Sequence, residues 1–200
     1  MMKKTLLWET GTWTNAPLST CQDGDTLKVT AKEGSDYWKN TLYGFDRSSG
    51  HALLANWEDS EAIEVTFQLA SFNELYDQAG IMLYQGPEQW IKAGIEINDN
   101  IPQLAVVVTN GYSDWSLSAV PDWVGEEVTL RASRMNDAVI IRARTEAHGW
   151  RTVRVAPFPY KSAKQAGPFL CSPTRVGFEV TFTRWVTTMP DADLHIDPPM

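Results

Sequence analysis

The sequence has little of what most metal, redox and nucleic-acid sites require. Its 200 residues include two cysteines and three histidines, too few for a disulfide scaffold or a four-cysteine zinc site. The 17 lysines and arginines are outnumbered by 25 aspartates and glutamates, which gives a net charge of -8. That charge argues against binding to a phosphate backbone or an anionic membrane. We therefore expect no metal, no cofactor, no nucleic-acid partner and no membrane partner.

Long apolar runs and the common nucleotide or nucleophile motifs are also missing. After Lys3 and Lys4 the apolar stretch ends at Glu9, which is too short for a signal-peptide core. There is no Walker loop, no Gly-x-Gly-x-x-Gly, no Gly-x-Ser-x-Gly and no Cys-x-x-Cys. These absences predict a cytoplasmic protein in which Cys21 and Cys171 are reduced, although the two could form one bridge.

Tryptophan is the residue present in excess. The chain has 9 tryptophans, with 6 tyrosines and 7 phenylalanines. One interpretation is a large all-β core. The other is a surface that stacks sugar rings, because an indole combines a large flat contact area with one polar group.

Alternating apolar and polar residues recur along the whole chain and predict strands. Ile63, Val65 and Phe67 alternate with polar residues, and similar runs are separated by turn formers such as Asn110-Gly111. We predict one all-β domain over residues 1–200, an antiparallel β-sandwich, with a closed barrel as the alternative. Residues 190–200 are expected to form a loosely ordered C-terminal tail, because they are rich in proline and aspartate.

The segment from 78 to 105 allows a strand register to be predicted. With a loop over residues 85–89, Tyr84 lies opposite Trp90 and Gln78 lies opposite Glu96. Trp90, Lys92 and Glu96 then share the outward face, because alternate residues of a strand point the same way. On that face Gly80, Gly94 and Ala105 form a row of small residues, which we interpret as a trough.

Few residues suit catalysis. Hydrolysis of a glycosidic bond generally needs two carboxyl groups. Glu96 and Glu179 lie on outward strand positions, and His51 follows a cluster of aromatic residues. These three residues are the catalytic candidates, and no sequence feature shows that any two of them meet.

Several segments resemble one known family. They are Asp36-Tyr37-Trp38, Tyr43-Gly44-Phe45, Gly50-His51, residues 76–82, residues 90–96, residues 107–109 and 112–116, Cys171-Ser172-Pro173 and Gly177-Phe178-Glu179-Val180. Together they resemble the bacterial and fungal domain of unknown function labelled "regulation of enolase". The resemblance implies a concanavalin A-like lectin/glucanase fold, the jelly-roll form of the sandwich. It also implies a set of candidate ligand-binding residues: Trp38, Tyr43, His51, Asp77, Trp90, Lys92, Glu96, Asp114 and Trp115.

Three functions fit this sequence. The first is a cytoplasmic lectin-like domain that binds a small carbohydrate or sugar-derived metabolite in a concave cleft. The second is a glycan- or metabolite-active enzyme that uses Glu96 with Glu179 or His51. The third is a regulatory module that binds a protein partner through exposed aromatic residues. The Glu-x-Asp-x-x-Glu strand of laminarinase-type enzymes is absent, which favours binding over catalysis.

Overall fold

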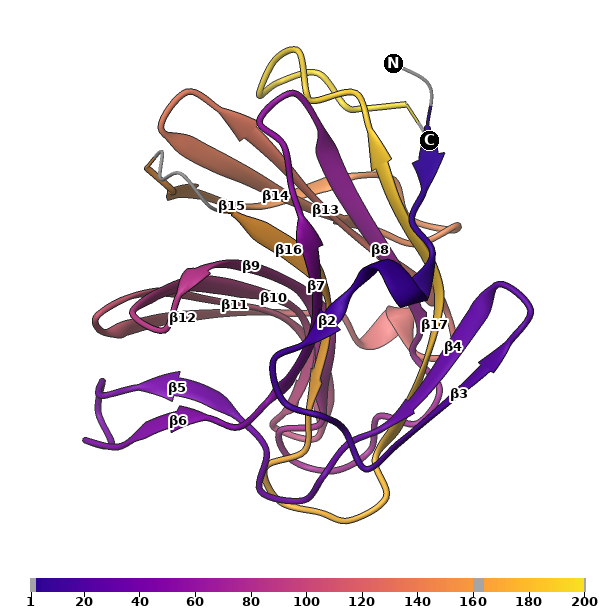
Figure 1. The fold of residues 1–200 in the computed structure, drawn as a ribbon, viewed down its shortest axis with the longest axis vertical. Helices are drawn as coiled ribbons and strands as arrows, with labels where there is room; N and C mark the ends of the chain where they lie inside the picture. The colour runs from indigo at the N-terminus through magenta and orange to yellow at the C-terminus, as the bar shows by residue number, and fades with distance from the viewer. Residues whose placement is uncertain (1–2, 160–163, 200) are drawn as a thin grey trace.

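The computed structural model describes residues 3–159 and 164–199, which fold into two facing antiparallel sheets and a two-stranded arm (Figure 1). One sheet has seven strands in the spatial order β12 (Ser113–Ala119), β11 (Ile101–Asn110), β10 (Gln89–Asn98), β9 (Gln78–Gly86), β16 (Gln165–Cys171), β7 (His51–Asn56) and β2 (Thr12–Trp13). The other has eight, in the order β15 (Arg151–Pro157), β14 (Ala138–Arg144), β13 (Glu127–Met135), β8 (Ala62–Gln68), β17 (Glu179–Thr188), β4 (Thr26–Thr30) and β3 (Ser19–Asp23), with β1 (Lys4–Thr5) beside β17. The arm consists of β5 (Tyr37–Lys39) and β6 (Asp46–Ser48), and short 3-10 turns cover Trp8–Thr10 and Pro121–Trp123.

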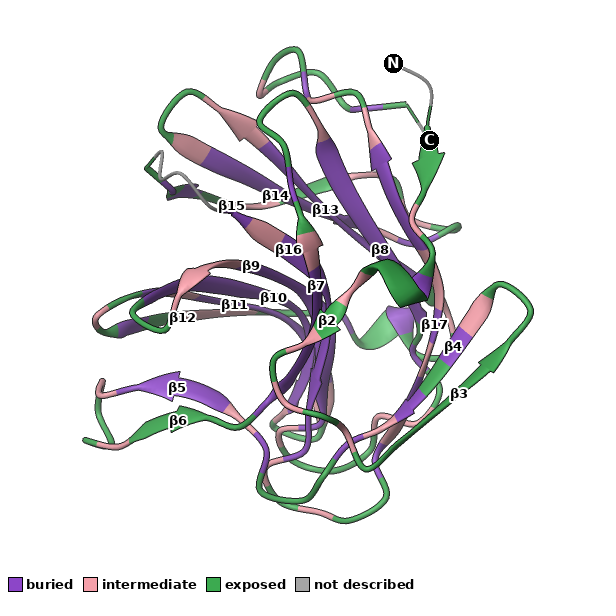
Figure 2. Cartoon of the chain, viewed as in Figure 1, coloured by how far each residue is buried: buried purple, intermediate pink, exposed green. Residues whose placement is uncertain are grey.

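The predicted antiparallel β-sandwich is confirmed, and its core lies between the two sheets. Along β8, the side chains of Ile63, Val65 and Phe67 are almost fully buried and belong to this core. Figure 2 shows the same burial along the central strands of both sheets. Four of the tryptophans pack here, so the core accounts for much of the aromatic excess: Trp8, Trp57, Trp123 and Trp185.

The predicted register of β9, β10 and β11 is also confirmed. Trp90 of β10 pairs with Tyr84 of β9. Glu96 of β10 pairs with Gln78 of β9 on one side and with Gln103 of β11 on the other. β10 and β11 are joined by Asp99 and Asn100, whose φ angles are 52° and 61°. A two-residue hairpin loop of type I′ has positive φ at both positions, and Asp and Asn tolerate it better than most residues.

The row of small residues has a different cause from the one expected. A Cβ placed on Gly94 would lie 2.0 Å from the carbonyl oxygen of Ala79, and one on Gly80 would lie 2.1 Å from that of Ala93. The two glycines therefore allow two neighbouring backbones to approach each other. The space left along the row is only about 10 Å³, so the row is not a ligand trough.

The arm covers the outer face of the seven-stranded sheet (Figure 1). The backbone N–H of Lys39 donates to Ser113 Oγ over 2.9 Å, and Asn40 Nδ2 donates to the Gly111 carbonyl over 3.0 Å. Between arm and sheet lies a second apolar cluster, in which Tyr37 packs on Trp90. A sheet face that alternation marks as outward is therefore buried here.

The C-terminal segment is attached to the eight-stranded sheet through Asp191. Its fully buried carboxylate accepts hydrogen bonds from Arg131 Nε at 2.8 Å and Arg142 Nε at 2.9 Å. Its backbone N–H donates to Ser133 Oγ, and Arg142 also donates to the Leu194 carbonyl. At Asp191 the segment is therefore fixed in place, in contrast to the loose order expected for residues 190–200.

The Asp191 attachment makes a stability prediction. Replacing Asp191 with Asn leaves two buried guanidinium groups without their shared carboxylate, and we expect the free energy of unfolding to fall by about 3 kcal/mol or more. Urea unfolding measures the loss. The exposed Asp193→Asn is the matched control, and equal midpoints for the two variants would contradict the prediction.

The glycine pair makes a second stability prediction. Gly94→Ala forces a methyl group onto backbone atoms that cannot move independently, so we expect it to cost about 3 kcal/mol or more. Gly149→Ala is the control, because a Cβ there meets nothing within 4 Å. Thermal unfolding compares them, and a Gly94→Ala protein as stable as Gly149→Ala would contradict the close backbone contact at Gly94.

Candidate functional site

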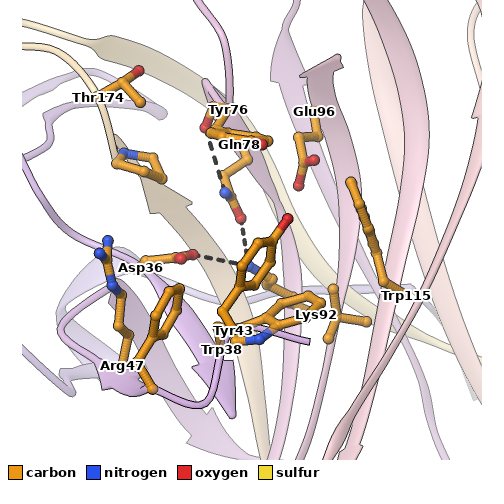
Figure 3. A pocket seen from close by; sticks show the side chains of 13 residues that line it. Asp36, Trp38, Tyr43, Arg47, Tyr76, Gln78, Lys92, Glu96, Trp115 and Thr174 are labelled. Atoms are coloured by element: carbon orange, nitrogen blue, oxygen red, sulfur yellow. Dashed lines mark hydrogen bonds and ion pairs between the residues drawn. The ribbon is translucent and has the colours of Figure 1, made fainter. Parts of the chain in front are cut away.

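A pocket of about 320 Å³ lies between the arm and the outer face of the seven-stranded sheet (Figure 3). Strands β9, β10, β11 and β12 supply its floor and one wall, and the arm supplies the opposite wall. Its lining consists of Asp36, Trp38, Tyr43, Phe45, Arg47, Tyr76, Gln78, Lys92, Glu96, Val107, Trp115, Pro173 and Thr174. A concave site of this size, with aromatic walls and a few polar groups, is typical of small-molecule binding.

The floor contains a buried ion pair. Lys92 Nζ donates to Asp36 Oδ1 over 3.1 Å and to Gln78 Oε1 over 2.7 Å. Burial alone would lower the pKa of Lys92, but the Asp36 carboxylate and the neighbouring Cys171 and Glu96 together raise it. Lys92 is therefore charged, and its charge is neutralised by Asp36.

Glu96 is the acidic group of the pocket that has no ion-pair partner like that of Asp36. It is 4% exposed and points into the pocket from β10, and its Oε1 has no hydrogen-bond partner among the described residues (Figure 3). Burial raises the pKa of Glu96 to about 7, with Asp36 adding to the rise, and with Lys92 and a hydrogen bond to the Asn98 side chain opposing it. Glu96 therefore titrates near neutral pH, and its Oε1 is available to accept a hydrogen bond.

The walls are aromatic. Trp38 lies edge-on to both Tyr43 and Trp115, with ring centroids 5.7 Å and 6.1 Å away. Tyr43 stacks on Phe45 at 5.4 Å, and the Arg47 guanidinium lies over the Phe45 ring at 4.4 Å. These rings present flat apolar faces above a charged floor.

Five of the nine predicted ligand-binding residues meet in this pocket. They come from three places in the chain: the arm, β10 and β12. Period-2 alternation explains the contribution of β10, because Lys92 and Glu96 lie on one face of that strand. The five are Trp38, Tyr43, Lys92, Glu96 and Trp115.

His51 and Asp77 are buried outside the pocket and have structural partners. The His51 Nε2 accepts the backbone N–H of Lys32 at 3.0 Å, and its Nδ1 lies 3.0 Å from the Asn15 carbonyl. Burial lowers the pKa of His51, so the ring is neutral. Asp77 accepts two hydrogen bonds from Arg175 and orders the loop before β9. Neither side chain lines the pocket.

Trp90, Asp114 and Glu179 also lie outside the pocket lining. Trp90 is 3% exposed beneath Tyr37, whose ring centroid is 5.7 Å away. Asp114 precedes Trp115 on β12 and so points to the opposite face, where it pairs with Arg154 at 2.9 Å. Glu179 belongs to the other sheet and pairs with Lys28. The expected pairing of Glu96 with Glu179 or His51 is therefore not found.

Sequence reasoning missed several lining residues. Asp36 and Phe45 lie within segments that carry the family resemblance, and Gln78 faces Glu96 in the predicted register. Tyr76 also lies within such a segment, residues 76–82, whereas Arg47 on the arm had no signal. The predicted register could have identified Gln78. The residues of the arm could not be placed in the same way, because the arm reaches the sheet through a long-range contact.

Two absences apply to the described part of the chain. Within residues 3–159 and 164–199 no group of three or more His, Cys, Asp or Glu side chains is arranged to hold a metal ion. None of its helical turns is long or apolar enough to cross a membrane. Both cysteines are free, Cys21 exposed on β3 and Cys171 buried on β16 of the other sheet.

The raised pKa of Glu96 predicts how stability depends on pH. The folded protein holds this proton up to about pH 7 and the unfolded chain loses it near 4.5, so stability falls as the pH rises between these values. For a pKa shift from 4.5 to about 7, the loss in the free energy of unfolding is on the order of 3 kcal/mol. Urea unfolding from pH 4 to 8 measures this loss of stability, and we expect the Glu96→Gln protein not to show it.

Other groups titrate in the same range, so the quantity to compare is the difference between wild-type and variant curves. Glu179→Gln serves as the control, because Glu179 is partly exposed and paired. Its difference from wild type is expected to stay constant across the range. A constant difference for Glu96→Gln as well would contradict the assignment.

Comparison with known proteins shows the family. Regulation of enolase protein 1 of Saccharomyces cerevisiae is 39% identical over 180 residues, 90% of each chain. A crystal structure of a functionally unknown protein from the same yeast has a TM-score of 0.86 and 37% identity, covering 94% of this chain and 100% of that one. A xylan beta-1,4-xylosidase from Bacillus halodurans has a TM-score of 0.63 at 13% identity, and the likeness covers 82% of this chain but 32% of the enzyme, which shows a shared β-sandwich fold alone. Residues 13–190 match the family described as "Protein of unknown function (DUF1349)", and the chain belongs to that family.

Proposed function

We propose that the protein binds a small sugar-like ligand in the pocket between the arm and the seven-stranded sheet, without turning it over. The observation that carries the proposal is Glu96, a buried carboxyl with an unpartnered oxygen inside an aromatic pocket. A buried polar atom without a partner is costly, and a ligand hydroxyl that donates to it removes that cost. We also propose that the protein acts in the cytoplasm, since its free cysteines are compatible with a reducing environment.

The walls support a ring-shaped ligand. Trp115 and Trp38 offer faces wide enough to cover one side of a sugar ring, while the floor offers Glu96, Gln78 and Lys92 to its hydroxyls. Aromatic faces with a few convergent polar groups are the combination that binding pockets generally use. The position of the arm over the sheet provides the depth that an open sheet face lacks.

Catalysis has one supporting observation. A carboxyl with a pKa of about 7 suits proton transfer at neutral pH. The partners expected for it, Glu179 and His51, lie elsewhere, and Asp36 is already paired with Lys92. Binding needs only what the pocket contains, whereas turnover needs a second free group, so binding is the better-supported function.

Regulation through a protein partner is the second candidate function. Its support is the name of the yeast relative, Regulation of enolase protein 1. The tip of the arm adds an exposed apolar feature, since Leu42 is 84% and Tyr43 is 51% exposed. The tip adjoins the pocket mouth, so ligand binding and partner binding would share one edge of the molecule.

The binding proposal predicts a ligand-dependent rise in melting temperature. We expect at least one compound in a panel of neutral, amino and acidic monosaccharides and sugar phosphates to stabilise the protein, because ligands that bind the folded state do so by mass action. Trp115→Ala removes one wall, and we expect the dissociation constant of that compound to rise by about tenfold or more.

Trp150→Ala is the matched control, because Trp150 packs against Arg144 outside the pocket. It should leave the dissociation constant unchanged. If no compound in the panel binds and purified enolase binds directly, the ligand proposal is wrong and the partner hypothesis replaces it.

A further inference from the structure

The charges that line the pocket do not all have partners. Four charged side chains contribute to it: Asp36, Arg47, Lys92 and Glu96. Asp36 and Lys92 neutralise each other through a 3.1 Å contact, and Gln78 completes the hydrogen bonding of the ammonium group. The remaining acidic group, Glu96, is 4% exposed and has an unpartnered oxygen.

Arg47 does not supply the missing positive charge. Figure 3 places Arg47 and Glu96 on opposite sides of the pocket, and the Arg47 guanidinium is stacked over Phe45 at 4.4 Å. Lys92, although on the same strand face as Glu96, directs its ammonium group to Asp36 and Gln78. The space beside Glu96 is therefore the part of the pocket in which neither Lys92 nor Arg47 is engaged with the carboxyl group.

The walls around that space favour a cation. Aromatic ring faces carry partial negative charge and attract ammonium and guanidinium groups, most strongly where water is excluded. The pocket already contains one such contact, Arg47 over Phe45. Figure 3 shows the rings of Trp38, Tyr43 and Trp115 bordering the volume into which Glu96 points.

We propose that the ligand presents a protonated amine to Glu96, so that the sugar-like molecule is an amino sugar. This inference rests on the proposed function and narrows it. A neutral hydroxyl would give the carboxylate a hydrogen bond only. An ammonium group brings a full positive charge to the carboxylate as well as a hydrogen bond, and it adds the attraction of the rings.

The test compares sugars that differ at one position. D-glucosamine and 6-amino-6-deoxy-D-glucose carry the amine at two different places, D-glucose carries none, and D-glucuronic acid carries a negative charge. Isothermal titration at pH 7.5 measures each dissociation constant against wild type, Glu96→Gln and Glu179→Gln. We expect at least one amino sugar to bind about tenfold or more tightly than glucose in wild type and in Glu179→Gln.

The expected preference disappears in Glu96→Gln, which keeps a hydrogen-bonding group of the same shape but no charge. Equal affinities for glucose and the amino sugars in wild type would overturn the amine proposal while leaving the sugar-binding function standing. Tightest binding of glucuronic acid would overturn it in the same way. If none of the four sugars binds and no other compound of the panel binds, the proposed function is overturned, and the amine proposal with it.

Discussion

The contact between Lys92 and Asp36 is the interaction on which the rest of the site depends. Lys92 belongs to the middle of a strand, and Asp36 immediately precedes the arm, so their 3.1 Å ion pair joins the sheet to the arm. A buried lysine without a counter-charge would lose its proton or destabilise the fold. The sheet therefore needs the arm at this point, and the arm's position over the sheet closes the pocket.

The same contact determines the state of Glu96. Two carboxylates and one ammonium group share a buried floor, and the ammonium group is committed to Asp36 and Gln78. Glu96 therefore experiences burial and the Asp36 charge with only partial relief from Lys92, and its pKa is about 7. A carboxyl kept in this state lowers the stability of the protein above neutral pH. That cost is the physical reason to regard Glu96 as a functional group.

The parts of the structure that could be predicted are those governed by local periodicity. Alternation along residues 78–105 predicted the register of three strands and the shared face of Lys92 and Glu96, both of which the pairing confirms. The same rule, applied to Asp114 and Trp115, separates them, since adjacent residues of a strand point to opposite faces. Family resemblance grouped them because motifs record sequence proximity.

What could not be predicted depends on contacts between distant segments. The arm and the tail are each fixed by partners far away in the chain, Asn40 by Gly111 and Asp191 by Arg131 and Arg142. Residues such as His51 look functional in a sequence because histidine is rare, yet here the ring satisfies two backbone groups. Glu96 and His51 are both buried, and they differ in whether every polar side-chain atom has a partner. That difference, visible only in three dimensions, together with the position of Glu96 in the pocket, is the reason for proposing Glu96 and not His51 as a ligand contact.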